Sequence, residues 1–433
     1  SFTQPEEPGV QGTDSGMQNF LVSFGPGLLW AGSAIGVSHL VQSTRAGATA
    51  GFALTGVIIF ALILKYPFFE FGPRYAAATG ESLVEGYRRI GRWALWLYLL
   101  IMLSTVVFTN AAILLFTEAL FQYALGTSFS PTLASAVVYS GCLLLLWVGH
   151  YKALDLAIKI VVLVLALSTL VAASLILPQA DFSDLSLIPL MPSDGTVTLA
   201  FMIAIAGWMP VGIEAATLSS LWTLAKDKST NVRTSVTTAR LDFNIAYVGT
   251  GVLAFAFLIL GAVVMYGSGE EFSPSPAGFS TQLIALYEGT LGGWAGPIVV
   301  TAAVTAMFST TLTVMDGYPR AIDRAIKVIK TDDPDQTANA DISEPYWIAL
   351  IGIGVLMTLF LHFFVSSLTQ MIDFITIVSF MAGPILGYLN LKAVTSPHVP
   401  KEHQPGKAML AFSYFGLVSM VVVAIIFLIS RVG

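Results

Sequence analysis

Residues 204–214 read AIAGWMPVGIE and lie in the middle of an apolar run that is long enough to cross a membrane. Pro210 removes a backbone donor and clashes with the preceding helical turn, and the glycines on either side of it lower the cost of leaving helical geometry. The stretch SAIGVSH, residues 33–39, likewise places small and polar residues in the middle of an earlier apolar run. We therefore predict two membrane-crossing helices that are interrupted near their midpoints.

The composition is that of a membrane protein. Of the 433 residues, 55% are hydrophobic and 11% are charged, whereas about 25% of the residues in an ordinary soluble domain are charged. A soluble fold cannot bury so much apolar surface. Apolar windows of roughly 19 residues predict an all-α, polytopic protein with about eleven transmembrane helices. The predicted spans are residues 21–45, 48–72, 93–124, 132–149, 153–177, 196–225, 240–267, 291–316, 345–364, 368–391 and 408–430.

The basic residues are confined to alternate loops. All but three of the 20 Lys and Arg residues lie in or beside the loops that follow the second, fourth, sixth, eighth and tenth spans. Because cytoplasmic loops are enriched in Lys and Arg, we predict that these loops and the N-terminus are cytoplasmic. Residues 1–19 are polar and acidic, and we predict that they form a disordered cytoplasmic tail.

The two predicted breaks fall in the first and sixth spans, five spans apart. An odd number of spans in a repeat inverts the second copy relative to the first, so this spacing predicts a five-plus-five inverted repeat. Within a single transmembrane domain, residues 20–433, we place the first repeat at 20–178, the second at 196–392 and an extra helix at 408–430. Interrupted backbone at membrane depth must face protein or a water-filled cavity, which predicts a binding site between the breaks.

Several helix-packing motifs resemble those of the Nramp-type divalent-metal transporters. They are FGPGLL at residues 24–29, AGA at 46–48, RYAAATGESL at 74–83, Met209-Pro210 in the sixth span, STTLT at 309–313 with Gly317, and Ser379-Phe380 through Pro384. The resemblance implies the LeuT-type fold of the APC superfamily. It also implies a secondary active transporter that carries manganese, iron or a related divalent ion, commonly together with protons.

The metal-binding motifs of that family are altered in this chain. Family members use an Asp-Pro-Gly-Asn break in the first helix and a Met-Pro-His break in the sixth. Carried over position by position, the first motif becomes Gly36, Val37, Ser38 and His39, and the second becomes Met209, Pro210 and Val211. The chain therefore looks like the family's fold with most of its metal ligands removed.

We predict a substrate site at the two breaks. Its candidate residues are Gly36, Ser38, His39, Ala206, Trp208, Met209 and Glu214. His39 and Met209 are the candidate metal ligands, because an imidazole and a thioether suit a softer divalent ion. Glu214 lies about one helical turn after Pro210 and can replace the missing negative charge if it faces the cavity. His39 and Glu214 are also the candidate proton-coupling groups.

The sequence leaves two kinds of cargo open. The resemblance favours a divalent cation such as manganese, moved by alternating access. A half-helix that begins at a break points unpaired N–H groups into the cavity, and this favours an anionic or neutral organic solute when no carboxylate opposes it.

The remaining predictions concern partners and cofactors. The predicted partners are the lipid bilayer of an inner or plasma membrane and the transported ion or solute, with no nucleic acid, and a monomer is compatible with the sequence. The chain has no phosphate-binding loop, dinucleotide fingerprint or zinc-hydrolase motif. We therefore predict neither an enzyme activity nor a resident cofactor.

Overall fold

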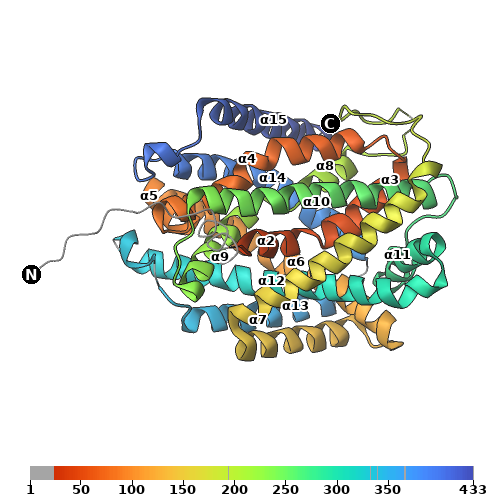
Figure 1. Cartoon of the computed structure of the whole chain (residues 1–433), viewed down its shortest axis with the longest axis horizontal. Coiled ribbons are helices and arrows are strands. Elements are labelled where there is room, and N and C mark those ends of the chain that lie inside the picture. The colour runs from red at the N-terminus through yellow and green to blue at the C-terminus, as the bar shows by residue number, and fades with distance from the viewer. Residues whose placement is uncertain (1–23, 194, 332, 339, 365–366, 433) are drawn as a thin grey trace, which may run out of the picture.

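The computed structural model describes residues 24–432 with the exception of 194, 332, 339, 365 and 366, and Figure 1 shows the arrangement of its elements. The described residues form helices joined by turns and loops, with no β-strand among them, as the composition predicts. Most of the long helices run along the same direction. The predicted tail, residues 1–19, lies outside the described residues.

Within the described residues, eight segments are long and apolar enough to cross a membrane. Two of them lie in α7 (Pro131–Ile176), which covers the predicted fourth and fifth spans and which Figure 1 shows as a gold arm and a yellow arm. The other six are the helices α4 (Thr55–Thr79), α6 (Arg92–Leu125), α10 (Val236–Val264), α13 (Glu344–Phe364), α14 (Leu368–Val394) and α15 (Lys407–Val432). The predicted eighth span is covered by α12 (Gly296–Lys330).

The first and sixth spans are both interrupted, as the sequence predicts. The first consists of α2 (Pro26–Ala34), an interruption at Ile35 and Gly36, the π-helix η1 (Ser38–Ser43) and α3 (Thr44–Ala50). The sixth consists of α8 (Leu199–Gly207) and α9 (Ala215–Thr230), and residues 208–214 between them leave helical geometry. Each half-helix is shorter than a bilayer crossing requires, so the two halves together make one span.

The second span begins later than the sequence predicts. The prediction placed it at residues 48–72, but residues 51–54 form a turn after α3 and the helix α4 begins at Thr55. Gly51 has a φ of 56°, a conformation that glycine adopts without steric cost, and this ends α3. The shift places Lys65 near the middle of α4, whereas in a span of residues 48–72 it would lie nearer the cytoplasmic end.

Two groups of helices frame the breaks. The helices α2, α3, α4, α9 and α10 pack on one another, and α6, α7, α12 and α13 form a second group. The helix α14 contacts α4 and α8 as well as α6, so it joins the two groups. Trp30 of α2 holds the first half-helix in place, because its ring lies 5.1 Å from that of Phe243 and 5.3 Å from that of Phe69.

Shorter helices lie in the connections. They are α5 (Leu83–Ile90), α11 (Pro276–Leu291) and the 3₁₀ turns Leu177–Gln179, Gly293–Ala295, Pro334–Gln336 and Lys401–His403. The helix α5 begins with a capping box, in which Ser82 and Glu85 satisfy backbone donors reciprocally. Because neither α5 nor α11 is long enough to span a bilayer, a reading of apolar windows does not predict them.

The predicted basic loops lie together at one end of the molecule. Glu85 of α5 pairs with Arg324 of α12 at 2.9 Å, and Lys228 of α9 pairs with Asp341, which precedes α13. These contacts join the loops that follow the second, sixth and eighth spans. Figure 1 shows α5 and α9 toward this end. The charge pattern that places these loops on one side of the membrane thus agrees with the fold.

Candidate functional site

A small cavity lies between the two breaks. Its volume is about 30 Å³, roughly the space that one or two water molecules occupy. The two interrupted spans line it together with α6 and α12. The polar residues of its wall are Ser33, Ser38, Thr109, Trp208, Glu214, Thr310 and Tyr318. The cavity therefore lies where the sequence predicts the substrate site.

The first break is filled by a threonine from α12. A Cβ atom built on Gly36 would lie 2.8 Å from Cγ2 and 2.9 Å from Oγ1 of Thr310, so no larger residue fits at position 36. The Thr310 hydroxyl donates a hydrogen bond of 2.7 Å to the carbonyl oxygen of Gly32. An unbroken helix would supply the N–H of residue 36 to that carbonyl. A neutral side chain thus completes the hydrogen bonding that the break removes.

His39 is bonded within the protein and does not line the cavity. Its Nε2 atom lies 2.8 Å from the carbonyl oxygen of Thr250, so it donates to α10. Its Nδ1 atom lies 2.7 Å from the hydroxyl of Ser38 and 3.1 Å from the carbonyl oxygen of Ala34. The imidazole is fully buried, and it ties the π-helix η1 to α10.

Glu214 is the single carboxylate among the residues that line the cavity. It lies directly before α9, at the second break. Its oxygens have long contacts with two hydroxyls, 3.5 Å from Tyr318 and 3.4 Å from Ser379. Hydrogen bonds of this length are weak, so both oxygens retain capacity to bind a cation or a proton.

Lys65 reaches the second break from α4. Its Nζ atom lies 2.9 Å from the carbonyl oxygens of Ala206 and Gly207 and 3.0 Å from those of Met209 and Val211. The side chain is 3% exposed. The ammonium group therefore satisfies the carbonyls that the interruption of the sixth span frees.

Comparisons with known proteins agree with this architecture. The family model of natural resistance-associated macrophage protein-like proteins matches residues 27–430. The chain belongs to the Nramp family. It is 31% identical over 418 residues to an uncharacterized protein of Pasteurella multocida. The alignment covers 95% of this chain and 93% of that protein. As the family is one of membrane transporters, this Nramp protein is an integral, multi-pass membrane transporter.

Solved structures confirm the LeuT-type fold. One match is a crystal structure of the Eremococcus coleocola manganese transporter in complex with an aromatic bis-isothiourea substituted compound. Its TM-score is 0.70 at 16% identity, and the match covers 97% of this chain and 88% of that chain. The crystal structure of MhsT in complex with L-phenylalanine matches with a TM-score of 0.56 and 16% identity, covering 94% of this chain and 97% of that chain. At these identities the likeness shows the fold alone.

The structure separates the predicted site residues of this Nramp protein into two sets. Ser38, Trp208 and Glu214 line the cavity. The other four do not: Gly36 packs against Thr310, His39 bonds to α10, the Ala206 carbonyl accepts from Lys65, and Met209 is fully buried. The metal-binding roles of His39 and Met209 remain predictions, and the geometry around the cavity does not add to them.

Sequence reasoning missed Lys65 and Thr310. A lysine in a strongly apolar helix was a usable signal, because ionisable residues inside membranes are commonly functional. The wrong start of the second span concealed it. Thr310 carried no such signal, since hydroxyl residues are common in membrane helices, where they bond across to neighbouring helices.

An ion pair connects the outer half of the first span to α14. The guanidinium of Arg45 binds both carboxylate oxygens of Asp373, at 2.8 and 3.1 Å, and the amide of Gln42 at 2.7 Å. Arg45 also lies over the ring of Phe201 in α8, 4.9 Å from the centroid. The contacts hold the outer halves of both broken spans near α14.

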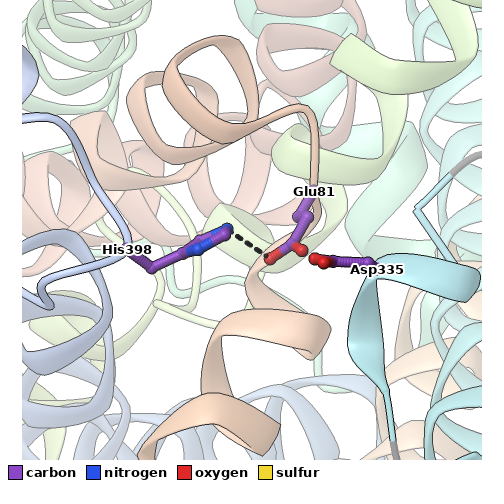
Figure 2. A group of neighbouring side chains, drawn as sticks. All are labelled: Glu81, Asp335 and His398. Carbon is purple, nitrogen blue, oxygen red and sulfur yellow. Dashed lines mark ion pairs between the residues drawn. The ribbon is translucent and has the colours of Figure 1, made fainter.

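A second cluster of ionisable side chains lies in the basic loops (Figure 2). Glu81, Asp335 and His398 bring three potential metal ligands together, the single such group among the described residues. Arg89 binds both carboxylates, at 2.5 Å in the case of Glu81. The hydrogen bond to Glu81 raises the pKa of Arg89. A guanidinium thus already pairs with both carboxylates, and we interpret the cluster as an ion-pair network between loops.

Proposed function

We propose that this Nramp protein is a secondary active transporter of a small divalent cation, which binds in the central cavity with Glu214 as its charged ligand. The observation that carries this proposal is the position of Glu214, the single carboxylate on the cavity wall. Apart from the indole N–H of Trp208, the other polar side chains there are hydroxyls, from Ser33, Ser38, Thr310 and Tyr318 among others. Oxygen donors of this kind suit Mn²⁺ or Mg²⁺ with retained water molecules better than they suit a soft ion.

The cavity also supports the divalent ion by its size. A volume of about 30 Å³ accommodates an ion with a water molecule and excludes an organic solute in this conformation. The manganese transporter of Eremococcus coleocola shares the fold, which supports Mn²⁺ as the first ion to test. The same carboxylate supplies a simple route to proton coupling, because a proton and a metal ion compete for the Glu214 oxygens.

The second candidate is a neutral or anionic organic solute that binds through acceptor groups. The observation in its favour is the indole N–H of Trp208, a cavity residue, which is buried and has no hydrogen-bond partner among the described residues. Lys65 adds a positive charge close to the same break. A solute of this kind requires the cavity to widen during the transport cycle.

Uptake into proteoliposomes tests both candidates. We expect Mn²⁺ uptake by the wild type, and a reduction of about 10- to 100-fold in Glu214→Gln at ion concentrations below saturation, because a charged ligand is lost. Glu118→Gln is the matched control, since Glu118 is a buried carboxylate of α6 that binds Gln122 at 2.6 Å and does not line the cavity.

Two results would contradict the divalent-cation proposal. One is Mn²⁺ uptake that Glu214→Gln leaves unchanged, since the proposed ligand would then be unnecessary. The other is an absence of uptake for Mn²⁺, Mg²⁺ and Ca²⁺ together with uptake of members of a panel of small organic acids. That second result would select the organic solute.

A further inference from the structure

Lys65 is surrounded by backbone carbonyls, and it makes no direct ion pair with any residue that the structure describes. Glu214, at the same break, interacts with it electrostatically, but no direct ion pair joins these two described residues. The four oxygens around Nζ all come from residues 206–211, and all lie 2.9–3.0 Å away. An ammonium group has three donors, so it shares them among four acceptors.

The interruption of the sixth span explains why these carbonyls need a partner. In a continuous helix the carbonyl of Ala206 would accept from residue 210, which is a proline and has no N–H, and its remaining backbone donor is the N–H of Met209 at a long 3.4 Å. The carbonyls of Gly207 and Met209 lose their helical donors because residues 208–214 leave helical geometry. Inside a bilayer no water is present to satisfy a free backbone group, so a cationic centre at this point stabilises the break.

The arrangement has the form of a cation site. Proteins replace the hydration shell of a monovalent ion with several carbonyl oxygens that lie at nearly equal distances from the ion. The C-terminal end of α8 also directs the negative end of its dipole to the same point. In transporters with broken helices, freed carbonyls and half-helix C-termini coordinate the coupling cation.

We propose that Lys65 is a tethered cation, whose ammonium occupies a four-carbonyl site at the α8–α9 break that would otherwise bind a free monovalent cation. The protein thereby supplies the positive charge of this site from its own chain and needs no dissolved monovalent ion there. Potassium and methylammonium ions are the ligands that the site takes when the lysine is removed, because potassium is close to ammonium in size and methylammonium carries the same ammonium head group.

The lysine stem fixes the charge at this point. Lys65 is anchored on α4, and its ammonium lies 5.6 Å from the centroid of the Phe69 ring, which favours a cation further. A compact ammonium can meet four oxygens on one side, whereas the planar fork of an arginine cannot. The proposal concerns Lys65 alone and does not depend on which cargo the central cavity binds.

Thermal unfolding of purified variants tests the proposal without any cargo. We expect Lys65→Ala to have a lower Tm than the wild type in N-methyl-D-glucamine chloride. Saturating methylammonium or potassium chloride of equal ionic strength should then raise its Tm by about 5 °C, because a ligand that binds only the folded state stabilises it. The wild type should respond equally to all three salts.

Two further variants complete the experiment. Lys226→Ala is the matched control, because it removes another buried lysine from α9 and should show no preference among the salts. Lys65→Met keeps the length of the stem while it removes the ammonium, and it serves if Lys65→Ala is lost during purification. Both Lys65 variants are extracted in methylammonium chloride as well as in N-methyl-D-glucamine chloride, and we expect recovery in the former.

Three outcomes would overturn the tethered-cation proposal. Folded Lys65 variants whose Tm is the same in all three salts would show that the carbonyls form no cation site. A wild type that responds to potassium as strongly as the variants would show that Lys65 does not occupy it. Loss of both variants in every salt would show that a free cation cannot replace the ammonium. Each outcome leaves the role of Glu214 in cargo binding unaffected.

Discussion

The carbonyl groups that lose their helical partners are hydrogen-bonded differently at the two breaks, by a neutral group at one and by a charged group at the other. At the first break, the neutral hydroxyl of Thr310 bonds to the freed carbonyl of Gly32. At the second break, the charged ammonium of Lys65 meets four carbonyls, and Glu214 of the same break lies on the cavity wall. The family motif that the chain resembles has an aspartate at the position of Gly36. In this chain the carboxylate of the cavity wall therefore comes from the second break.

The side-chain packing at each break fits the charge found there. Thr310 occupies the volume that a side chain at position 36 would need, so a carboxylate cannot be placed at the first break by a single substitution without a clash. The second break has a positive and a negative group, which together leave it close to neutral. We infer that Gly36 and Thr310 form a matched pair, as Lys65 and the carbonyls do at the other break.

The largest effect is expected when the first break is given a charge. Gly36→Asp places a Cβ atom 2.8 Å from Cγ2 of Thr310 and adds a buried carboxylate, so we expect a loss of about 3 kcal/mol or more in the free energy of unfolding. The double variant Gly36→Asp/Thr310→Ala should recover part of this loss, because it removes the clashing atoms. Tm measurements on the purified variants check both, and a single variant as stable as the wild type would disprove the matched pair.

A smaller effect tests the neutral hydrogen bond. Thr310→Val keeps the shape of the side chain and removes the hydroxyl, so the carbonyl of Gly32 loses its partner. We expect a loss of about 1 kcal/mol in the free energy of unfolding, seen as a lower Tm. Thr313→Val is the control, since among the described residues the Thr313 hydroxyl bonds to carbonyls of its own helix alone, at 2.9 and 3.0 Å. Equal losses in the two variants would mean that Thr310 has no special role at the break.

The smallest change in stability is expected at Gly212. A Cβ atom there would lie 2.2 Å from an oxygen of Glu214, and because that side chain is flexible, Gly212→Ala should cost about 1 kcal/mol or less. The displaced carboxylate should nevertheless weaken Mn²⁺ binding, which calorimetry measures. Gly249→Ala on α10 is the control, because its added Cβ atom meets nothing within 4 Å. Unchanged Mn²⁺ binding in Gly212→Ala would argue against Glu214 as the ligand.

Much of the fold could be predicted from local features of the sequence. The break of the first span was expected within residues 33–39 and lies at Ile35 and Gly36, and the second was expected around Pro210 and covers 208–214. Apolar length, proline and glycine act on the backbone within a few residues, so these features do not depend on distant contacts. The short helices α5 and α11 were not predicted, because they do not cross the membrane and contain no long apolar run.

The chain's sequence by itself determined that this is a membrane protein with two broken spans, and that it lacks the aspartate of the family motif. The tertiary structure alone decided which side chains face the breaks. Lys65 meets carbonyls that lie 141 to 146 residues away, Thr310 meets a carbonyl 278 residues away, and His39 turns to α10, away from the cavity. The direction of a helical side chain depends on how its helix is rotated against its neighbours, and that rotation is set by packing across the whole bundle.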